Sequence, residues 1–264
     1  MATCYRHPTR ETGVSCSNCG RPICPDCMTP TPVGMRCPEC SKQKTKVRDV
    51  RASYDAPPRV TVLLIAVNVL LFFGMSTQSG FGSAGGRLFQ DGALFGPAVA
   101  DGDWWRLITS GFLHSGILHI GFNMYVLWFL GNLLEPSLGP FRFAGLYLAS
   151  LLTGSFAVLL LQPNAATIGA SGAIFGLMGA AFVMQRARGV DPMQSGIGPI
   201  ILINLALGFI IPNVSVAGHV GGLLGGALCG FLMDQSARLR RREVPVLICV
   251  AIGAIAVAGS LAVA

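Results

Sequence analysis

Charged residues are scarce in this chain. Only 12% of its 264 residues are charged, against about 25% in a typical soluble domain, and 52% are hydrophobic. The mean hydropathy is +0.60. This composition excludes an ordinary soluble globular protein. The apolar residues come in blocks of roughly 17 to 25, the length that spans a bilayer, so we predict an all-α polytopic membrane protein.

Carboxylates are almost absent from these apolar blocks. No Asp lies in any of them, and Glu135 comes only at the inner end of the second. A pair of buried aspartates for aspartyl proteolysis is therefore missing, and so is the HExxH motif of zinc peptidases. A transporter or channel would need ion-pathway carboxylates and internal symmetry, and the sequence has neither.

The apolar blocks predict seven membrane spans. The first begins near Val60, which is too late for a cleavable signal peptide, so we expect none. The expected spans cover residues 60–76, 113–133, 141–161, 171–186, 196–212, 217–233 and 245–262.

Basic residues between the spans predict an orientation. The basic linker before the first span, the turn with Arg186 and Arg188, and residues 238–242 all fall on one side, whereas the turns near 162–170 and 212–216 carry no charge. Lys and Arg gather on the cytoplasmic side of membrane proteins, so we expect a cytoplasmic amino terminus. Spans four and six then both begin near the outer face.

Histidine is rare, and three of the four histidines lie at or near the outer ends of spans. Ser171 begins span four and His219 begins span six, so both are expected at similar depth. Serine is a poor nucleophile until a base takes its proton, and neutral histidine is the best-known base. Since no carboxylate lies at that depth to complete a triad, the sequence predicts a Ser171–His219 dyad.

Hydrogen-bond donors for a tetrahedral oxyanion are expected beside this dyad. His119 and Asn123 lie four residues apart on one face of span two, and both side chains can donate. The backbone N–H of Ser171, unpaired at a helix start, is a further donor. Span four is only about 22 Å long, shorter than a ~30 Å hydrocarbon core, so the loop before it must enter the membrane beside protein or a wet cavity.

Glycines recur four residues apart in spans four and six. Such stripes let helix backbones approach closely. We expect this packing to bring Ser171 and His219 to hydrogen-bond distance. The stripes consist of Gly172, Gly176, Gly218, Gly222, Gly226 and Gly230.

Cysteine use divides the chain, because seven of the nine cysteines precede residue 41. Ligand-type residues occur there as four pairs, each with a two-residue gap that lets a tight turn present both side chains to one metal. Eight ligands fit two structural zinc ions, one with three Cys and one His and one with four Cys. The pairs are Cys4 and His7, Cys16 and Cys19, Cys24 and Cys27, and Cys37 and Cys40.

A disulfide knot is the alternative for this segment. Seven is an odd number of cysteines, and the expected cytoplasmic location is reducing, so zinc is favoured. The pattern resembles B-box and other cross-braced zinc fingers. That resemblance implies that the first and third pairs share one zinc and the second and fourth pairs the other. Cys229 and Cys249 lie in apolar runs and are expected to be ordinary core thiols.

A basic linker, residues 42–59, joins this segment to the first span. It carries six Lys and Arg residues against Asp49 and Asp55, and Pro57-Pro58 stops any helix that arrives from the head. We interpret it as a cytoplasmic collar that can also contact anionic lipid. Binding of nucleic acid is the minor alternative, because topology already accounts for the net charge of +7.

Taken together, the membrane motifs resemble those of the rhomboid proteases. The resemblance implies a six-helix core, with a seventh helix added here, and hydrolysis of transmembrane substrates near the outer face without a cofactor. It implies that Ser171 is the nucleophile, that His219 is the general base, and that His119 and Asn123 serve the oxyanion hole. The matching motifs are Trp105-Arg106, His114-Ser115, His119-x-x-x-Asn123, Gly169-Ala170-Ser171-Gly172 and His219-x-x-Gly222-x-x-x-Gly226.

Four further residues are interpreted beside this resemblance. Phe175 stands where some members of the family have a tyrosine packed on the catalytic histidine, so stacking is expected without a hydroxyl. Trp105-Arg106 is expected to have a structural and positioning role in a loop lying partly in the membrane. His114 is expected to be structural rather than catalytic.

We therefore predict three regions: a B-box-like zinc-binding head at 1–41, the linker at 42–59 and a membrane protease domain at 60–264. The expected function is intramembrane serine proteolysis of transmembrane protein substrates, in the plasma membrane of a bacterium. The alternative is a proteolytically inactive rhomboid-like scaffold, but such relatives typically lack the serine or the histidine. The partner of the zinc head is not encoded in any motif, and nucleic acid is not expected.

Overall fold

The computed structural model describes residues 2–42, 58–80, 85–210, 214–236, 241 and 243–264. The chain divides into two compact units, Met1–Ala52 and Ser53–Ala264. Most of the predicted linker at 42–59 lies outside the described residues. So do part of the turn near 212–216 and most of the basic run at 238–242.

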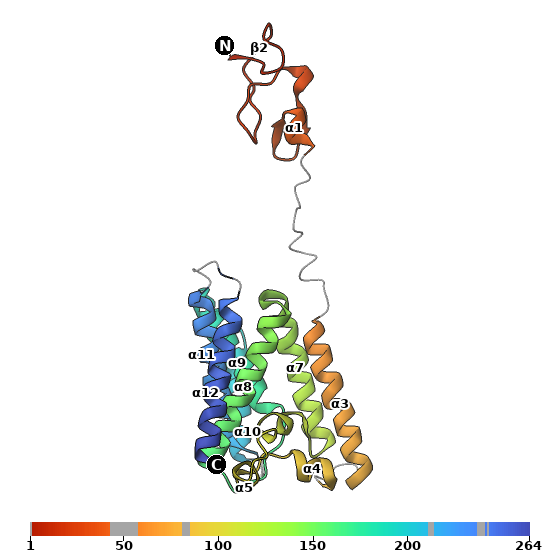
Figure 1. The fold of residues 1–264 in the computed structure, drawn as a ribbon, viewed down its shortest axis with the longest axis vertical. Helices are drawn as coiled ribbons and strands as arrows, with labels where there is room; N and C mark the ends of the chain where they lie inside the picture. Colours follow the sequence, from red (N-terminus) through yellow and green to blue (C-terminus); the bar gives the residue numbers. More distant parts are fainter. Residues whose placement is uncertain (1, 43–57, 81–84, 211–213, 237–240, 242) are drawn as a thin grey trace. The chain divides into compact units, whose positions relative to one another are not determined.

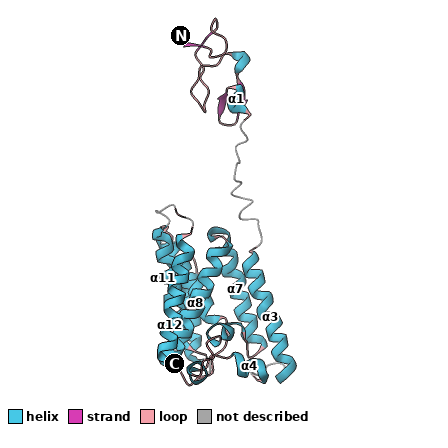
Figure 2. Ribbon diagram, in the orientation of Figure 1, coloured by secondary structure: helices cyan, strands magenta, loops and turns pink. Residues whose placement is uncertain are grey.

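The second unit is a bundle of long helices that run side by side (Figure 1, Figure 2). Within the described residues, five helices are long and apolar enough to cross a membrane: α3, α7, α8, α11 and α12. Two apolar helices between them are shorter, with 17 residues in α9 and 14 in α10. The bounds are Arg59–Ser79 for α3, Ile117–Leu138 for α7, Pro140–Leu161 for α8, Ser171–Ala187 for α9, Ile197–Ile210 for α10, Val216–Ser236 for α11 and Val244–Val263 for α12.

These helices correspond to the seven predicted spans, and the largest shift is in α7. It begins at Ile117 instead of 113, because Gly116 before it is extended, with φ −175° and ψ 167°. It continues past 133 to Leu138 and ends at Gly139, whose φ of +82° lies in the left-handed region that favours glycine. Pro140 then begins α8, where its missing N–H costs nothing.

Short helices occupy the segment between α3 and α7. They are α4 (Gly86–Gly92), α5 (Gly96–Ala100), α6 (Arg106–Thr109) and the 3-10 turn η2 (Ser110–Phe112). The backbone of this segment pairs with the loop before α9. The N–H of Leu94 donates to the Thr167 carbonyl at 3.0 Å, and the N–H of Thr167 donates back at 2.9 Å. Part of the loop that leads to Ser171 therefore has its backbone N–H and C=O groups hydrogen-bonded to protein, as non-helical structure in a membrane requires.

Helix α9 lies inside the bundle, in contact with α7, α8, α10 and α11. Its Leu177 and Met178 are almost fully buried and join a core with Phe143 and Tyr147 of α8 and Leu127 of α7. Lipid is as apolar as these side chains, so close packing rather than the hydrophobic effect holds such helices together.

A buried carboxylate joins α7 to the start of α3. Glu135, near the end of α7, is only 5% exposed. Its Oε1 accepts a hydrogen bond from the backbone N–H of Val60 at 2.9 Å. Its Oε2 accepts from the N–H and the hydroxyl of Thr61, at 2.9 and 2.7 Å. Glu135 therefore acts as an amino-terminal cap for α3, whose Val60 lies 75 residues earlier in the chain.

The first unit has little regular structure. Strands β1 (Ala2–Thr3) and β2 (Glu11–Thr12) pair antiparallel, as do β3 (Thr29–Thr31) and β4 (Gly34–Arg36). The 3-10 turn η1 (Pro25–Cys27) and the helix α1 (Pro38–Ser41) complete it. Its buried core consists of cysteine side chains and Ile23. A core this small needs a staple such as a metal to hold a fold.

Candidate functional site

The first residue of α9 and the fourth residue of α11 meet within the bundle. The Nε2 atom of His219 lies 2.9 Å from the Oγ atom of Ser171, a hydrogen-bond distance. His219 is only 8% exposed. The two residues are 48 positions apart in the chain, so their contact depends on how the two helices pack. Spacing of this kind allows the imidazole to accept the hydroxyl proton.

Glycines let α9 and α11 approach until their backbones touch. A Cβ atom added to Gly222 would overlap the carbonyl of Gly172, and one added to Gly226 would overlap the carbonyl of Gly176. Along the same contact, a Cβ on Gly230 would come within 2.8 Å of Ala180. The predicted glycine stripe therefore forms the surface that sets the distance between Ser171 and His219.

The turn before Ser171 also depends on a glycine. Gly169 has a φ of +127°, which side-chain-bearing residues rarely adopt. Its N–H donates to the Ser110 carbonyl at 2.9 Å. A Cβ at Gly169 would lie 2.7 Å from Nε2 of His119 and 3.7 Å from Oγ of Ser171. This turn therefore brings His119 of α7 beside Ser171.

One face of the His219 ring packs against an aromatic side chain, and one of its nitrogens is hydrogen-bonded to Ser171. Phe175, four residues after Ser171, stacks on it with ring centroids 4.2 Å apart and 20° between the planes. Stacking is thus retained at the position where the sequence departs from a tyrosine. Within the described part of the chain, Nδ1 of His219 has no hydrogen-bond partner. No third member of a triad is seen among those residues.

The two predicted oxyanion residues lie one turn apart on α7. Nδ1 of His119 lies 3.2 Å from the Ser115 hydroxyl, which leaves Nε2 on the side of Gly169 and Ser171. Asn123 is buried, and its Nδ2 donor lacks a partner among the residues that the structure describes. His119 is therefore beside the serine, and Asn123 is a buried donor in the same helix face.

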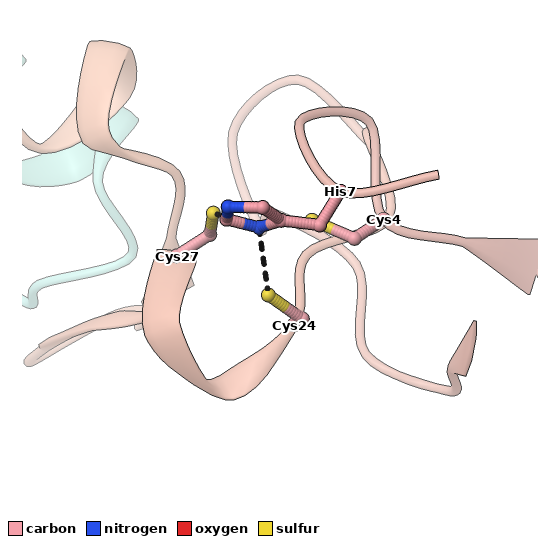
Figure 3. Close-up of side chains that lie close together, drawn as sticks. All are labelled: Cys4, His7, Cys24 and Cys27. Carbon is pink, nitrogen blue, oxygen red and sulfur yellow. Dashed lines mark hydrogen bonds between the residues drawn. The ribbon is translucent and has the colours of Figure 1, made fainter. Parts of the chain in front are cut away.

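In the amino-terminal unit, the first and third ligand pairs form one cluster (Figure 3). Nδ1 of His7 faces the sulfurs of Cys4, Cys24 and Cys27 at 3.8, 3.3 and 3.5 Å. Ligands of a tetrahedral zinc lie about 3.5 to 3.8 Å apart, because the metal bonds are ~2.3 Å to sulfur and ~2.0 Å to nitrogen. The donor set and its spacing therefore fit zinc.

The second and fourth pairs form the other cluster, with Cys16, Cys19, Cys37 and Cys40. The sulfurs of Cys19 and Cys37 are 3.9 Å apart. The backbone N–H of Cys37 donates to the sulfur of Cys16 at 3.3 Å, a bond that favours a metal-binding thiolate. This interleaving of the four pairs is the cross-braced arrangement implied by the resemblance to B-box zinc fingers.

Side chains also tie the two clusters together. The Tyr5 hydroxyl, next to Cys4, and the Arg6 guanidinium both donate to the Glu39 carboxylate, next to Cys40. The hydrogen bond from Tyr5 is the main cause, together with the one from Arg6, of a pKa of Glu39 that is lowered to about 2. Each end of the head is therefore joined to the other by a short polar contact as well as by the crossed ligand pairs.

Comparison with known proteins agrees with this geometry. Residues 101–236 match the Rhomboid domain model. The chain is 39% identical over 175 residues to the rhomboid protease GluP of Bacillus subtilis, a match that covers 65% of this chain and 34% of GluP. It is 34% identical over 189 residues to the putative rhomboid protease YdcA of the same organism, covering 69% of this chain and 92% of YdcA. The chain belongs to the rhomboid family.

The match does not extend equally over all relatives. RHOMBOID-like protein 7 of Arabidopsis thaliana is 35% identical over 158 residues, half of that protein's length. The chain thus aligns with about a third of GluP and half of RHOMBOID-like protein 7. The rhomboid domain match contains Ser171, His219, His119 and Asn123 but not the cysteine clusters. This rhomboid therefore carries its metal-ligand head outside the part that defines the family.

Trp105 and Arg106 organise the segment before α7 of this rhomboid. Arg106 is buried, and its guanidinium donates to the carbonyls of Gln90 and Ala93 at 2.6 and 2.9 Å. It also forms an ion pair with Asp103 at 2.8 Å. The indole N–H of Trp105 donates to the Asp91 carbonyl at 3.0 Å. Trp105 and Arg106, at the start of α6, thus bond backbone carbonyls at the end of α4 and just after it, which is a structural role.

His114 packs edge-on against His119, with ring centroids 4.9 Å apart. It is 1% exposed, and neither ring nitrogen has a hydrogen-bond partner in the described chain. This ring contact can hold His119 in place beside Ser171, which is a structural role.

Proposed function

We propose that this rhomboid is an intramembrane serine endopeptidase that hydrolyses peptide bonds in or near transmembrane segments of membrane-protein substrates. The 2.9 Å contact between Nε2 of His219 and Oγ of Ser171 carries this proposal. The alternative of an inactive scaffold lacks support, since both residues are present and in contact. Relatives named as rhomboid proteases also favour an active enzyme.

The residue roles follow from the contacts. Nε2 of His219 accepts the proton of Ser171 as Oγ attacks the carbonyl carbon of the substrate, and this proton then passes to the leaving amine. Water next attacks the acyl-serine, gives its proton to His219, and releases the carboxylate product while Oγ is reprotonated. Every proton that His219 accepts is returned within the cycle.

Charge on the carbonyl oxygen needs donors on the other side of Ser171. The Ser115 hydroxyl donates to Nδ1 of His119 in our assignment, which leaves the ring proton on Nε2, the nitrogen beside Gly169. The buried amide of Asn123 and the N–H of Ser171, at the start of α9, are further donors. We assign His119 and Asn123 to the oxyanion hole.

We place this site near the outer face of a bacterial plasma membrane, with the amino terminus in the cytoplasm. The turn before Ser171 bonds to Ser110 and Leu94, in the segment that follows α3. This turn therefore lies at the opposite end of the bundle from Arg59, and Arg59 is the residue that adjoins the basic linker. Two relatives from Bacillus subtilis support the bacterial assignment.

We further propose that the head, residues 1–41, holds two structural zinc ions and takes no part in the chemistry. Cys4, His7, Cys24 and Cys27 would hold one, and Cys16, Cys19, Cys37 and Cys40 the other. Each set supplies four protein ligands, so no position is left for a substrate. Residues 42–59 would serve as the linker and 60–264 as the protease domain, with transmembrane proteins as substrates and an unidentified partner for the head.

Cleavage of a model transmembrane substrate by the purified, reconstituted protein tests the function. We expect wild type to cut, and Ser171→Ala and His219→Ala each to lose at least about 10³-fold in kcat. Ser137→Ala is the control, because it removes a serine hydroxyl whose described hydrogen bond goes to the Leu134 carbonyl at the end of α7. A folded wild type that cuts none of several substrates and resists a serine-directed fluorophosphonate would refute the proposal.

A further inference from the structure

Ser215, one turn before His219, and Gln162 form a polar pair outside the rhomboid motifs. Ser215 directly precedes α11, and its Oγ accepts a hydrogen bond from the N–H of Gly218 at 3.2 Å. Its hydroxyl donates to Oε1 of Gln162 at 2.8 Å. Gln162 directly follows α8, as its carboxyl-terminal cap residue. A serine that bonds the N–H three residues on is an amino-terminal helix cap.

The capped turn is the one that carries His219. The backbone N–H of His219 donates to the Ser215 carbonyl at 3.2 Å, the first bond of the α11 ladder. If the first turn of the helix frays, this bond is broken early, and the imidazole moves relative to Ser171. Residues 211–213, shortly before α11, lie outside the described chain. Ser215 is described, and its side chain anchors the start of the helix.

Gln162 connects the same anchor to the serine side of the site. It begins the loop 162–170 that leads to Ser171, and its carbonyl accepts the N–H of Ala165 at 3.0 Å. Its side chain therefore bonds the start of the helix that carries His219 to the start of the loop that carries Ser171. The glycine contact sets the separation of α9 and α11, whereas this pair acts on the first turn of α11 alone.

We propose that Ser215 and Gln162 are positioning residues that hold His219 in its reactive orientation. This inference rests on the proposed serine protease function. Neither residue touches Ser171 or the ring of His219 in the described hydrogen bonds, so both act through the backbone of α11. Their loss is expected to lower kcat and to leave KM unchanged, because substrate binding does not involve the cap.

The chain offers a matched control for this pair. Ser195 donates to Oε1 of Gln185 at 2.6 Å, the same type of serine-to-glutamine bond, between the end of α9 and the turn before α10. A general loss of stability from breaking such a bond would affect both pairs. A loss of positioning at His219 would affect only Ser215 and Gln162.

Kinetics of Ser215→Ala, Ser215→Thr, Gln162→Ala and Ser195→Ala in the reconstituted full-length protein test the proposal. We expect Ser215→Ala to lower kcat about fivefold or more, the factor that corresponds to a typical serine cap, and Gln162→Ala to lower it in the same direction. Ser215→Thr keeps the hydroxyl and should retain most of the rate. Wild-type kcat in Ser215→Ala, or an equal fall in Ser195→Ala, overturns the proposal.

Amide hydrogen exchange separates this inference from the function on which it rests. Ser215→Ala should speed exchange in residues 216–222 about fivefold while Ser195→Ala leaves that segment unchanged. Unchanged exchange in Ser215→Ala overturns the positioning role even when the wild type cuts. A wild type that neither cuts nor reacts with a fluorophosphonate overturns the protease function and, with it, the catalytic purpose of the cap, whatever the exchange rate.

Discussion

The imidazole of His219 lies almost parallel to the ring of Phe175, with centroids 4.2 Å apart and 20° between the planes. The two residues come from neighbouring helices, and Phe175 is one turn after Ser171 on α9. The ring of Phe175 therefore packs on a face of the imidazole, whereas the hydrogen bond to Ser171 is made at the ring edge by Nε2.

Replacement of Phe175 tests this contact. Phe175→Leu keeps an apolar side chain but removes the stack, so kcat should fall by about two- to twelvefold, the factor that matches ~0.5–1.5 kcal/mol for an aromatic pair. Phe175→Tyr keeps the stack and should stay within about twofold of wild type. The measurement is kcat at saturating substrate. Equal rates for Phe175→Leu and wild type would show that the stack does not matter.

The glycine contact between α9 and α11 predicts intolerance of a single methyl group. Gly222→Ala and Gly226→Ala would press a Cβ against the carbonyls of Gly172 and Gly176, so each should lower the free energy of unfolding by about 1–3 kcal/mol and reduce cleavage. Gly121→Ala is the control, because no heavy atom lies within 4 Å of its added Cβ. Thermal unfolding in detergent provides the comparison. A Gly222→Ala protein as stable as Gly121→Ala would contradict the backbone contact.

The cap that Glu135 provides for α3 should matter for stability. Glu135→Gln replaces one of the two acceptor oxygens with an NH2 group, so either the N–H of Val60 or the two donors of Thr61 lose their acceptor, which should cost about 1–3 kcal/mol of unfolding free energy. Glu243→Gln makes the same chemical change at an exposed position and should be neutral. Denaturation of both variants in detergent decides the matter. Equal stability of the two would mean that the buried hydrogen bonds contribute nothing net.

Zinc content should follow the two clusters independently. Elemental analysis of the purified full-length chain should give about two zinc ions per molecule, from the four-ligand stoichiometry of each cluster. Cys24→Ser and Cys37→Ser should each lower this to about one, while Cys229→Ser, in α11, should leave it at two. Loss of both ions from either head variant would show that the clusters are not separate sites.

Deletion of residues 1–41 asks whether the head tunes proteolysis. Each cluster of the head supplies four protein ligands and leaves no position for a substrate, so we expect kcat and KM for a model substrate in bilayers to be unchanged. A changed rate would assign the head a regulatory role. The chelated full-length protein is the second arm, and it should behave as the deletion does.

Much of this protein was predictable from local pattern. Apolar blocks predicted the positions of the long helices, five of which are long enough to cross a membrane in the described chain, because a helix is the structure that satisfies its own backbone in lipid. Pairs of ligands two residues apart predicted the metal clusters, because a turn of that size presents two side chains together. The roles of Ser171 and His219 stay predictions, although their contact is now observed.

Contacts between distant residues were not predictable in the same way. Helical periodicity indicates which face of α7 is buried, but it does not say that Glu135 meets the first turn of α3. The serine at 215 fits the pattern of a helix cap, whereas nothing in the sequence pairs it with Gln162, 53 residues earlier. Arg106 could likewise be placed at an interface but not on the carbonyls of Gln90 and Ala93.

The sequence by itself determined the helices, the metal-ligand pairs and the presence of one serine and one histidine at helix starts. The tertiary structure decided which atoms face one another: Nε2 of His219 toward Ser171, the ring of Phe175 against the imidazole, and Nε2 of His119 beside Gly169. The physical reason is that hydrogen bonds and ring stacking depend on distances of a few tenths of an ångström. Those distances are set by the close approach of helix backbones at glycines, which no local pattern specifies.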